Sequence, residues 1–237
     1  MHYLDEASQF VHALQFKDLP AEVVERARLI LLDSMGVMIA GAREPHISAM
    51  TKALRARGSN GRSLFMTDGR TGDAGDAAMI NGVSICAHVA EDGHKYARGH
   101  VSAYVLPAAL AAAEERQLSG AAFLTALVAA YELVSRLGMA CRVRSGMHPS
   151  GTWGTVGCAA AVAKIMGLQL RQIRETMNVA APLNGPAGSS IDATLAWLHA
   201  EAPAAQLSSD SRTVRTGDVF FAYPGDASDG RRYIEQA

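Results

Sequence analysis

The sequence predicts a mainly all-α protein, a helical bundle of about eight helices with a short α/β appendage at the C-terminal end. Three observations support this prediction. Of the 237 residues, 49% are hydrophobic and 19% are charged, which allows a substantial core. Aromatic residues make up only 6% while alanine and glycine are abundant, and this composition suits closely packed helices better than a β-sandwich. Apolar residues also recur in helical patterns over the first 180 residues.

The expected helices follow one another with short connections. The second loses its charges after Asp33, so its later half is expected to be buried on all sides. Residues 59–72 are polar and glycine-rich, which indicates a loop with one short extended piece. The predicted helices are 2–16, 23–42, 47–57, 74–88, 101–115, 119–142, 150–166 and 170–180.

The chain changes character at Pro182, where Pro, Gly, Asn and Ser become concentrated as in a linker. A short helix is expected at 191–200, a buried strand at 219–223 and a further helix from Asp229. Such a short helix cannot cover its strand, so we expect this appendage to be unfinished. The predicted division is a helical domain at 1–183, a linker at 184–190 and the appendage at 191–237.

Charge and cysteine content argue against several classes of protein. A net charge of −1, from 22 basic and 23 acidic residues, argues against a nucleic-acid-binding surface. Cys86, Cys141 and Cys158 are widely spaced, which suggests neither a disulfide framework nor a zinc ribbon and fits a reducing cytoplasm. The N-terminus lacks a signal-peptide pattern, and the longest uncharged apolar stretch, 121–131, is too short to span a bilayer. We therefore expect a cytoplasmic protein without membrane or nucleic-acid partners.

The most informative motif surrounds His148, which immediately precedes an expected helix start that Ser150 can cap. Gly151, Gly154 and Gly157 recur every three residues and give this helix a small face, against which a neighbouring backbone can pack closely. A helix N-terminus favours an anion such as a carboxylate, and a histidine beside it could move a proton. The alternative is that the glycines serve packing alone and the histidine is a surface loop residue.

A second motif follows the helix expected at 74–88 and concentrates chemistry-bearing side chains within thirteen residues. Adjacent carboxylates and imidazoles can shift each other's pKa values toward neutrality, which suits general acid/base catalysis. Two cations there could hold an anionic substrate. Two alternatives remain open: a solvated polar loop, and a metal site built from both carboxylate and imidazole ligands, although no established zinc signature matches. The motif contains His88, Glu91, Asp92, His94, Lys95, Arg98 and His100, and the metal alternative would use His88, Glu91, His94 and His100.

Three segments together are specific enough to carry a family resemblance: Leu19-Pro-Ala-Glu-Val-Val with Leu31-Leu-Asp-Ser-Met-Gly-Val, Asn81-Gly-Val through Val105-Leu-Pro, and Gly146-Met-His-Pro-Ser-Gly-Thr-Trp-Gly-Thr-Val-Gly. Through them, residues 1 to about 183 resemble the N-terminal part of the 2-methylcitrate dehydratase (MmgE/PrpD) family. That family also includes cis-aconitate decarboxylase and iminodisuccinate epimerase.

The resemblance implies a metal-independent lyase without a cofactor, acting on a small tricarboxylic or dicarboxylic acid. Such enzymes remove a proton next to a carboxylate and then expel water or carbon dioxide, or reprotonate the carbon. We expect dehydration of the 2-methylcitrate type, with decarboxylation or epimerisation of a related acid as the alternative, and a homo-oligomer, the family's dimer. The implied catalytic residues are His148, His100 and Glu91 or Asp92, and the expected substrate contacts are His94, Lys95, Arg98, Ser150 and Thr152.

Family members are longer and contribute lysine and tyrosine side chains from later segments, so this chain alone is expected to be truncated and weak or inactive. A catalytically empty helical module that binds a partner through an unpaired apolar surface is the alternative of a different kind. Residues 191–237 resemble instead the start of the UDP-sugar-binding domain of the UDP-N-acetylmuramoyl-tripeptide ligases, the Mur ligases. By that resemblance Ser211 and Arg212 would lie near the UDP moiety, although the ATP- and peptide-binding domains have no counterpart and ligase activity is not expected.

Overall fold

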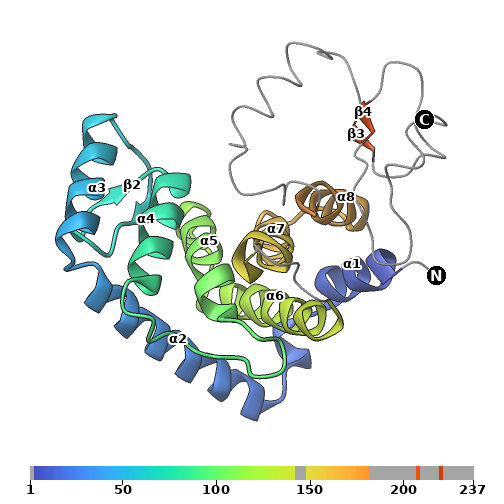
Figure 1. Cartoon of the computed structure of the whole chain (residues 1–237). Coiled ribbons are helices and arrows are strands. Elements are labelled where there is room, and N and C mark those ends of the chain that lie inside the picture. The colour runs from blue at the N-terminus through green and yellow to red at the C-terminus, as the bar shows by residue number, and fades with distance from the viewer. Residues whose placement is uncertain (1–2, 142–147, 182–206, 209–218, 221–237) are drawn as a thin grey trace.

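The structure is a computed structural model that describes residues 3–141, 148–181, 207–208 and 219–220. These residues form eight α-helices, as the sequence predicts, together with two short 3-10 helices and two pairs of two-residue strands (Figure 1). The α-helices are α1 (Tyr3–Ala13), α2 (Ala21–Gly41), α3 (Pro45–Ala56), α4 (Ala74–Cys86), α5 (Val101–Glu115), α6 (Gly120–Ala140), α7 (Trp153–Ile165) and α8 (Leu170–Ala180). The 3-10 helices are η1 (Phe16–Asp18) and η2 (Pro149–Gly151).

The strands are minor features. β1 (Ser63–Leu64) and β2 (Thr71–Gly72) pair antiparallel within the predicted loop between α3 and α4. β3 (Leu207–Ser208) and β4 (Val219–Phe220) pair parallel, and β4 covers the first two residues of the strand expected at 219–223. The predicted linker and the helices expected at 191–200 and from 229 lie outside the described residues.

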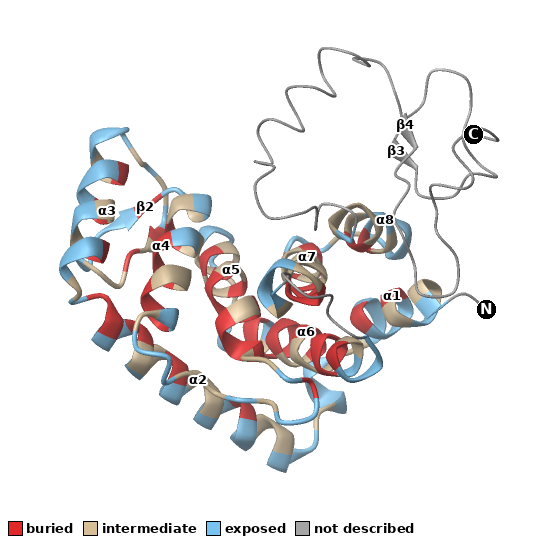
Figure 2. Cartoon of the chain, viewed as in Figure 1, coloured by how far each residue is buried: buried red, intermediate tan, exposed pale blue. Residues whose placement is uncertain are grey.

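The core lies where α5, α6 and α7 pack together, and buried residues concentrate on these helices (Figure 2). The small face predicted for the helix after His148 is confirmed at Gly157, because a Cβ there would lie 2.8 Å from Cγ1 of Val105 and closer still to Val134. Helix α6 is long and apolar enough to cross a membrane by length and composition, yet 61% of its most apolar window is buried inside the protein. Neighbouring helices cover most of the apolar side chains of α6, so α6 is a helix of the protein core.

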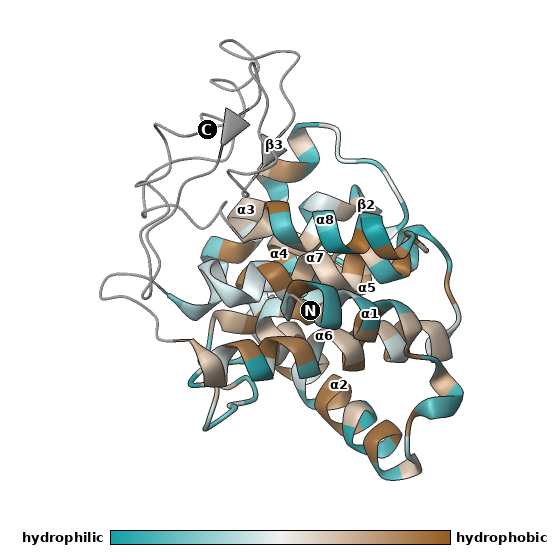
Figure 3. Cartoon of the chain, turned by 90° about the vertical axis from the view of Figure 1, so that its right-hand side faces the viewer, coloured by the Kyte–Doolittle hydropathy of each residue, from teal (hydrophilic) through white to brown (hydrophobic). Residues whose placement is uncertain are grey.

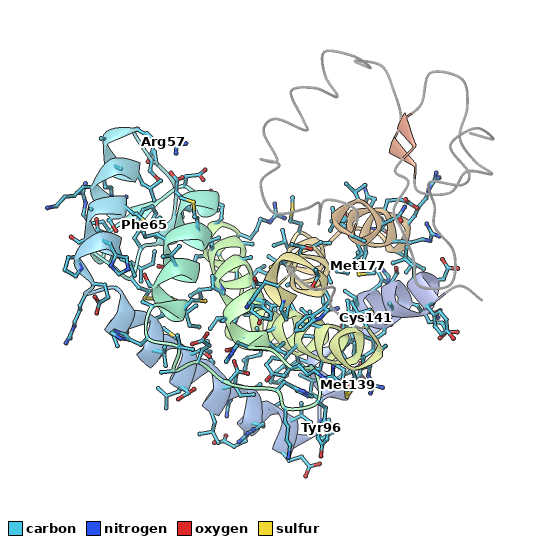
Figure 4. All side chains as sticks on the ribbon, viewed as in Figure 1. Arg57, Phe65, Tyr96, Met139, Cys141 and Met177 are labelled. Carbon is cyan, nitrogen blue, oxygen red and sulfur yellow. The ribbon has the colours of Figure 1, made fainter. Side chains whose placement is uncertain are left out.

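The loop between α3 and α4 is fastened to α3 by one arginine. Arg55 donates to both carboxylate oxygens of Asp68, at 3.0 and 2.9 Å, and to the carbonyl oxygens of Arg70 and Thr71. Its guanidinium also lies 3.9 Å from the centroid of the buried ring of Phe65, which fills the space between α3 and α4 (Figure 4). These contacts hold the loop between α3 and α4 in place at the end of the fold that is remote from α1.

The prediction that the later half of α2 is buried on all sides is wrong. Its inner side is buried at Ser34, Met38 and Gly41, but on the outer side Leu32 is 70% and Ile39 44% exposed. Helix α2 runs along the edge of the molecule and packs on one side only, chiefly against α4 (Figure 1). The outer apolar residues therefore have no cover within the part of the chain that the structure describes.

Candidate active site

Residues 87–100 connect α4 to α5 and contain the second predicted motif. Two of them have left-handed backbone, Val89 with φ 51° and Arg98 with φ 56°. This conformation is unfavourable for side chains with a Cβ, above all for β-branched valine, and such strain persists only where surrounding structure holds it. A tight turn is closed by two hydrogen bonds, from the His94 N–H to the Gly99 carbonyl and from the Arg98 N–H to the His94 carbonyl, both 2.8 Å. The segment therefore forms a defined turn, and several of its residues are exposed.

Asp92 anchors this segment to the helices behind it. Its Oδ1 accepts from both the backbone N–H and the hydroxyl of Ser102 in the first turn of α5, and Oδ2 accepts from the hydroxyl of Tyr131 on α6 at 2.5 Å. The Ser102 hydroxyl in turn accepts from Ser34 on α2 at 2.9 Å, and both serines are buried. A carboxylate at a helix N-terminus is also favoured by the helix dipole. Asp92 therefore accepts three hydrogen bonds that hold it against α5 and α6.

Glu91 lies in a different environment from its neighbour. Only 6% of its side chain is exposed, and Oε2 is buried without a hydrogen-bond partner among the described residues. Oε1 lies 3.8 Å from Nδ1 of His100. A buried carboxylate is costly unless a cation or donor compensates it, so this open oxygen marks a place where a proton or a ligand donor can be received.

His100 is held in one tautomer by its surroundings. Its Nδ1 lies 3.0 Å from the carbonyl oxygen of Asp92. Because a carbonyl oxygen can only accept a hydrogen bond, Nδ1 carries the proton in the neutral ring, and Nε2 is the nitrogen with a free lone pair. The His100 side chain is 37% exposed.

His148 is held in the opposite tautomer. It is exposed and forms the N-cap of η2, where its Nδ1 accepts from the backbone N–H of Ser150 at 3.3 Å and lies 2.7 Å from the Ser150 hydroxyl. A backbone N–H can only donate, so Nδ1 is unprotonated and Nε2 carries the proton of the neutral ring. The expected helix start at Ser150 is wrong, because residues 149–151 form a separate 3-10 turn and α7 begins at Trp153.

Both predicted histidines meet Tyr104, one turn into α5. The Tyr104 hydroxyl oxygen accepts from the His100 backbone N–H at 3.0 Å, and its ring lies edge-to-face with the His148 ring at a centroid distance of 6.3 Å. Trp153 contacts the same ring at 5.4 Å and buries an indole N–H that has no acceptor among the described residues. Gly99 permits this packing, since a Cβ there would lie 2.5 Å from the Trp153 ring. Tyr104 therefore links the backbone at His100, in the second motif, to the His148 ring of the first.

Burial raises the pKa of the Tyr104 hydroxyl, the His100 N–H lowers it, and the negative charges of Glu91 and Asp92 raise it further. Burial likewise raises the pKa of Tyr131, and the hydrogen bond to Asp92 adds to this effect. Both hydroxyls therefore stay protonated at neutral pH, which leaves the Tyr104 hydroxyl hydrogen able to donate to a bound oxygen.

The other predicted contacts divide into two groups. The His94 ring is used within its own turn, where Nδ1 accepts from the Ala97 N–H at 3.0 Å, and Thr152 Oγ1 donates to the Pro149 carbonyl at 3.0 Å. Lys95 and Arg98 are exposed on the same turn, and no ion pair within the described part of the chain engages either. Ser211 and Arg212 lie outside the described residues.

The metal alternative does not form. Within residues 3–141 and 148–181, no group of three or more His, Cys, Asp and Glu side chains is placed to hold a metal ion. His88 points instead toward Glu44, with Nε2 3.5 Å from Oε1, while His94 bonds to its own backbone turn. The four suggested ligands therefore do not converge.

Sequence reasoning missed the residues that hold the site together, namely Tyr104, Trp153, Tyr131 and Ser102. One signal was available for Tyr104, which follows His100 by four residues and so lies one helical turn away in an alanine-rich helix. A tyrosine within a buried helix also needs a partner for its hydroxyl group. Tyr131 and Ser102 come together only through the packing of α6 against α5, which no local pattern reveals.

Comparison with known proteins gives several relatives. A cis-aconitate decarboxylase-like protein, oryM, of Aspergillus oryzae is 30% identical over 186 residues, covering 74% of this chain and 39% of the relative. A cis-aconitate decarboxylase of Aspergillus terreus is 27% identical over 184 residues, covering 74% of this chain and 38% of the relative. The chain thus spans about two fifths of the length of these curated relatives.

A third similarity is short and of another kind. A UDP-N-acetylmuramoyl-L-alanyl-D-glutamate–2,6-diaminopimelate ligase of Janthinobacterium sp. (strain Marseille) is 55% identical over 49 residues, which cover 21% of this chain and 10% of the ligase. This agrees with the Mur ligase resemblance of the appendage.

The family assignment rests on a match to most of the chain. The sequence profile of the MmgE/PrpD N-terminal domain matches residues 5–210, which include most of α1, all of α2 to α8 and both site motifs. The match extends past the boundary predicted near residue 183, and the division into domains stays a prediction. The chain belongs to the MmgE/PrpD family, through its N-terminal domain.

Proposed function

We propose that this chain carries the histidine acid/base pair of a lyase that acts on a small dicarboxylic or tricarboxylic acid. The observation that supports this most strongly is the pair of opposite tautomers around Tyr104. His100 presents an unprotonated Nε2 that can take a proton, while His148 presents an Nε2–H that can hydrogen-bond a leaving oxygen and gives up a proton from the imidazolium form. A pair of groups prepared for opposite roles is what elimination next to a carboxylate requires.

In the proposed reaction, His100 Nε2 removes a proton from the carbon next to a substrate carboxylate and becomes imidazolium. The electron pair left on that carbon is delocalised into the carboxylate. Glu91, with Oε1 3.8 Å from the ring, stabilises the imidazolium. In dehydration, His148 first takes up a proton from solvent and becomes imidazolium. The C–O bond then breaks as Nε2 of this imidazolium gives its proton to the leaving hydroxyl, so water departs, a double bond forms and the His148 ring returns to its neutral form.

Decarboxylation uses the same residues in another order, and the names of the relatives favour it for this chain. The C–C bond to one carboxylate breaks, carbon dioxide leaves, and the released electron pair shifts through the adjacent double bond. The carbon at the far end of that double bond takes a proton from a protonated histidine. The histidine then regains a proton from water. Dehydration of the 2-methylcitrate type and epimerisation stay proposals for the same site, because all three reactions need a proton transfer next to a carboxylate.

We propose that the cationic side chains near the two histidines bind the substrate. Lys95 and Arg98 are exposed on the turn that ends at Gly99, and Ser150 lies against His148. These groups, with the hydroxyls of Tyr104 and Thr152, would hold the carboxylates. Glu91, rather than Asp92 with its three hydrogen bonds, is the carboxylate proposed to take part in the chemistry. We also propose a cytoplasmic location, since Cys86 and Cys158 are free thiols, as a reducing compartment maintains them.

The test measures proton transfer itself, with the full chain and cis-aconitate in D₂O. NMR follows deuterium incorporation at the carbons next to the carboxylates, and calorimetry measures binding of the same acid. We expect exchange above the protein-free rate, reduced about 100-fold or more by His100→Asn or His148→Asn with little change in affinity. His46→Asn, an exposed histidine on α3, is the matched control and should exchange like the unsubstituted chain. Binding without exchange, or unchanged exchange in His100→Asn, would contradict the proposal.

The similarity to the ligase supports a second, separate candidate, binding of UDP by the appendage through Ser211 and Arg212. Calorimetric titration with UDP tests it. An Arg212→Ala variant should lose the binding, while His100→Asn should keep it.

A further inference from the structure

A pocket lies between α2 and α6, and neither His100 nor His148 lines it. The two helices approach each other there (Figure 1), and the pocket has a volume of about 230 Å³. In other proteins a closed apolar cavity of about 150 Å³ is large enough to bind benzene. The pocket between α2 and α6 can therefore hold one ring with a substituent, or a short branched chain.

Most of the pocket wall is apolar. Hydrophobic stretches recur along α2 at the lower edge of Figure 3, and the N-terminal half of this helix supplies one wall of the pocket. Two of the apolar lining residues are buried and three are half-buried, so a ligand that enters must present an apolar body to them. These residues are Val23, Ala27 and Ile30 of α2 and Leu127 and Val128 of α6.

Three charged side chains also line the pocket, and Arg26 is the one without a compensating charge. Glu132 is paired, because Oε1 accepts from Nε of Arg136 at 2.7 Å. Glu22 lies in the first turn of α2, where the helix dipole favours a negative charge. Arg26 is exposed, and no ion pair between described residues engages it. A ligand can therefore neutralise the charge of Arg26.

The charge of Arg26 acts on the tyrosine that lines the same pocket. Burial and the hydrogen bond to Asp92 raise the pKa of Tyr131, while the positive charge of Arg26 lowers it. The Tyr131 hydroxyl already gives its proton to Asp92 at 2.5 Å, so it has none to offer a second acceptor. The guanidinium of Arg26 is then the donor available to a ligand, and its fork of N–H groups suits a carboxylate.

We propose that the pocket between α2 and α6 binds a small monocarboxylate with an apolar body, whose carboxylate pairs with Arg26. Additional carboxylates would lie against apolar side chains or near Glu22 and Glu132, where no cation compensates them. The ligand class therefore differs from the dicarboxylic and tricarboxylic acids proposed for the histidine site. Binding at this pocket does not require the chemistry proposed for those histidines.

Calorimetric titration of the full chain with benzoate tests the proposal. We expect a dissociation constant of about 1 mM or below, whereas acetate, which has the charge without the apolar body, should bind at least about tenfold more weakly. Arg26→Gln should weaken benzoate binding about tenfold or more, since the charged hydrogen bonds are lost. Arg28→Gln removes an exposed arginine of the same helix that does not line the pocket, and it should bind like the unsubstituted chain.

A second variant, Val128→Phe, fills the pocket and should also weaken binding about tenfold or more, because the apolar body then has no space. Circular dichroism checks that each variant is folded. No binding at about 10 mM benzoate would overturn the proposal. Equal effects of Arg26→Gln and Arg28→Gln would overturn it as well.

Hydrogen exchange in the presence of benzoate locates the bound ligand. Exchange should slow at residues 22–30 and 127–132, and also at 88–100, because any opening that displaces Tyr131 also disrupts the pocket. His100→Asn and His148→Asn, which test the proposed function, should bind benzoate like the unsubstituted chain. If binding is lost in Lys95→Gln/Arg98→Gln but kept in Arg26→Gln, the carboxylate binds at the candidate active site and the proposal is wrong.

Discussion

The hydroxyl of Tyr131 on α6 donates to Oδ2 of Asp92 at 2.5 Å, while Oδ1 accepts twice from Ser102 at the start of α5. One carboxylate therefore fastens the connection between α4 and α5 to the start of α5 and to α6. The carbonyl of the same Asp92 receives the Nδ1–H of His100. The tautomer proposed for catalysis thus depends on the position of Asp92.

Removing the Tyr131 hydroxyl should loosen this connection. Tyr131→Phe leaves the partly buried carboxylate short of one donor, and we expect the free energy of unfolding to fall by about 1–2 kcal/mol. Urea unfolding measures this loss, and hydrogen exchange should accelerate at residues 88–100. Tyr96→Phe is the control, since Tyr96 is 72% exposed and lies on the outside of the same segment (Figure 4). If the two variants have the same free energy of unfolding, the hydrogen bond between Tyr131 and Asp92 does not stabilise the fold.

Gly157 should be intolerant of any side chain. In an open helix, replacing glycine by alanine is stabilising by about 1 kcal/mol. Here the new methyl group would collide with Val134 and Val105, so Gly157→Ala should lower stability by about 1–3 kcal/mol as α7 is displaced. Gly151→Ala, where a Cβ meets nothing within 4 Å, should stay within about 0.5 kcal/mol of the unsubstituted chain. Thermal unfolding of both variants checks the difference.

The pair between Arg55 and Asp68 predicts part of the acid sensitivity. The hydrogen bonds from Arg55 hold the pKa of Asp68 below its ordinary value of 3.8. A lowered folded-state pKa contributes stability above pH 3.8, and this contribution is lost as the pH falls through the folded value. Asp68→Asn should therefore be less stable by about 1 kcal/mol at pH 7, and the deficit should shrink as the pH falls below 3.8. Glu6→Gln, at an exposed position on α1, controls for the change in net charge; a deficit independent of pH would contradict the prediction.

Cys158 should be an inert thiol. Burial raises its pKa to about 11, and its sulfur donates to the Tyr104 carbonyl at 2.8 Å. Since the thiolate is the reactive form, iodoacetamide at pH 8 should leave Cys158 largely unmodified in the folded chain while exposed Cys141 reacts. Mass spectrometry after digestion measures both sites, and urea should remove the difference. Alkylation of Cys158 at the rate of Cys141 in the folded chain would be incompatible with this burial.

Much of the fold could be predicted from local sequence, because apolar periodicity and caps are local signals. Asp73 caps α4 and Ser119 caps α6 through their own side chains. The site could be predicted only as two separate motifs, since Tyr104 joins His100 to His148 through the packing of α5 beside α7. The exposure of the outer side of α2 could not be predicted, because a buried apolar residue and an exposed one look alike in the sequence.

The account rests on the opposite tautomers of His100 and His148, and these can be observed directly. Long-range ¹H–¹⁵N spectra of the full chain with ¹⁵N-labelled histidine, at about pH 8.5 where an ordinary imidazole is neutral, distinguish the two ring nitrogens of each residue. Variants His100→Asn and His148→Asn assign the signals. We predict a proton on Nδ1 of His100 and on Nε2 of His148. A proton on Nε2 of both rings would contradict the proposed acid/base pair.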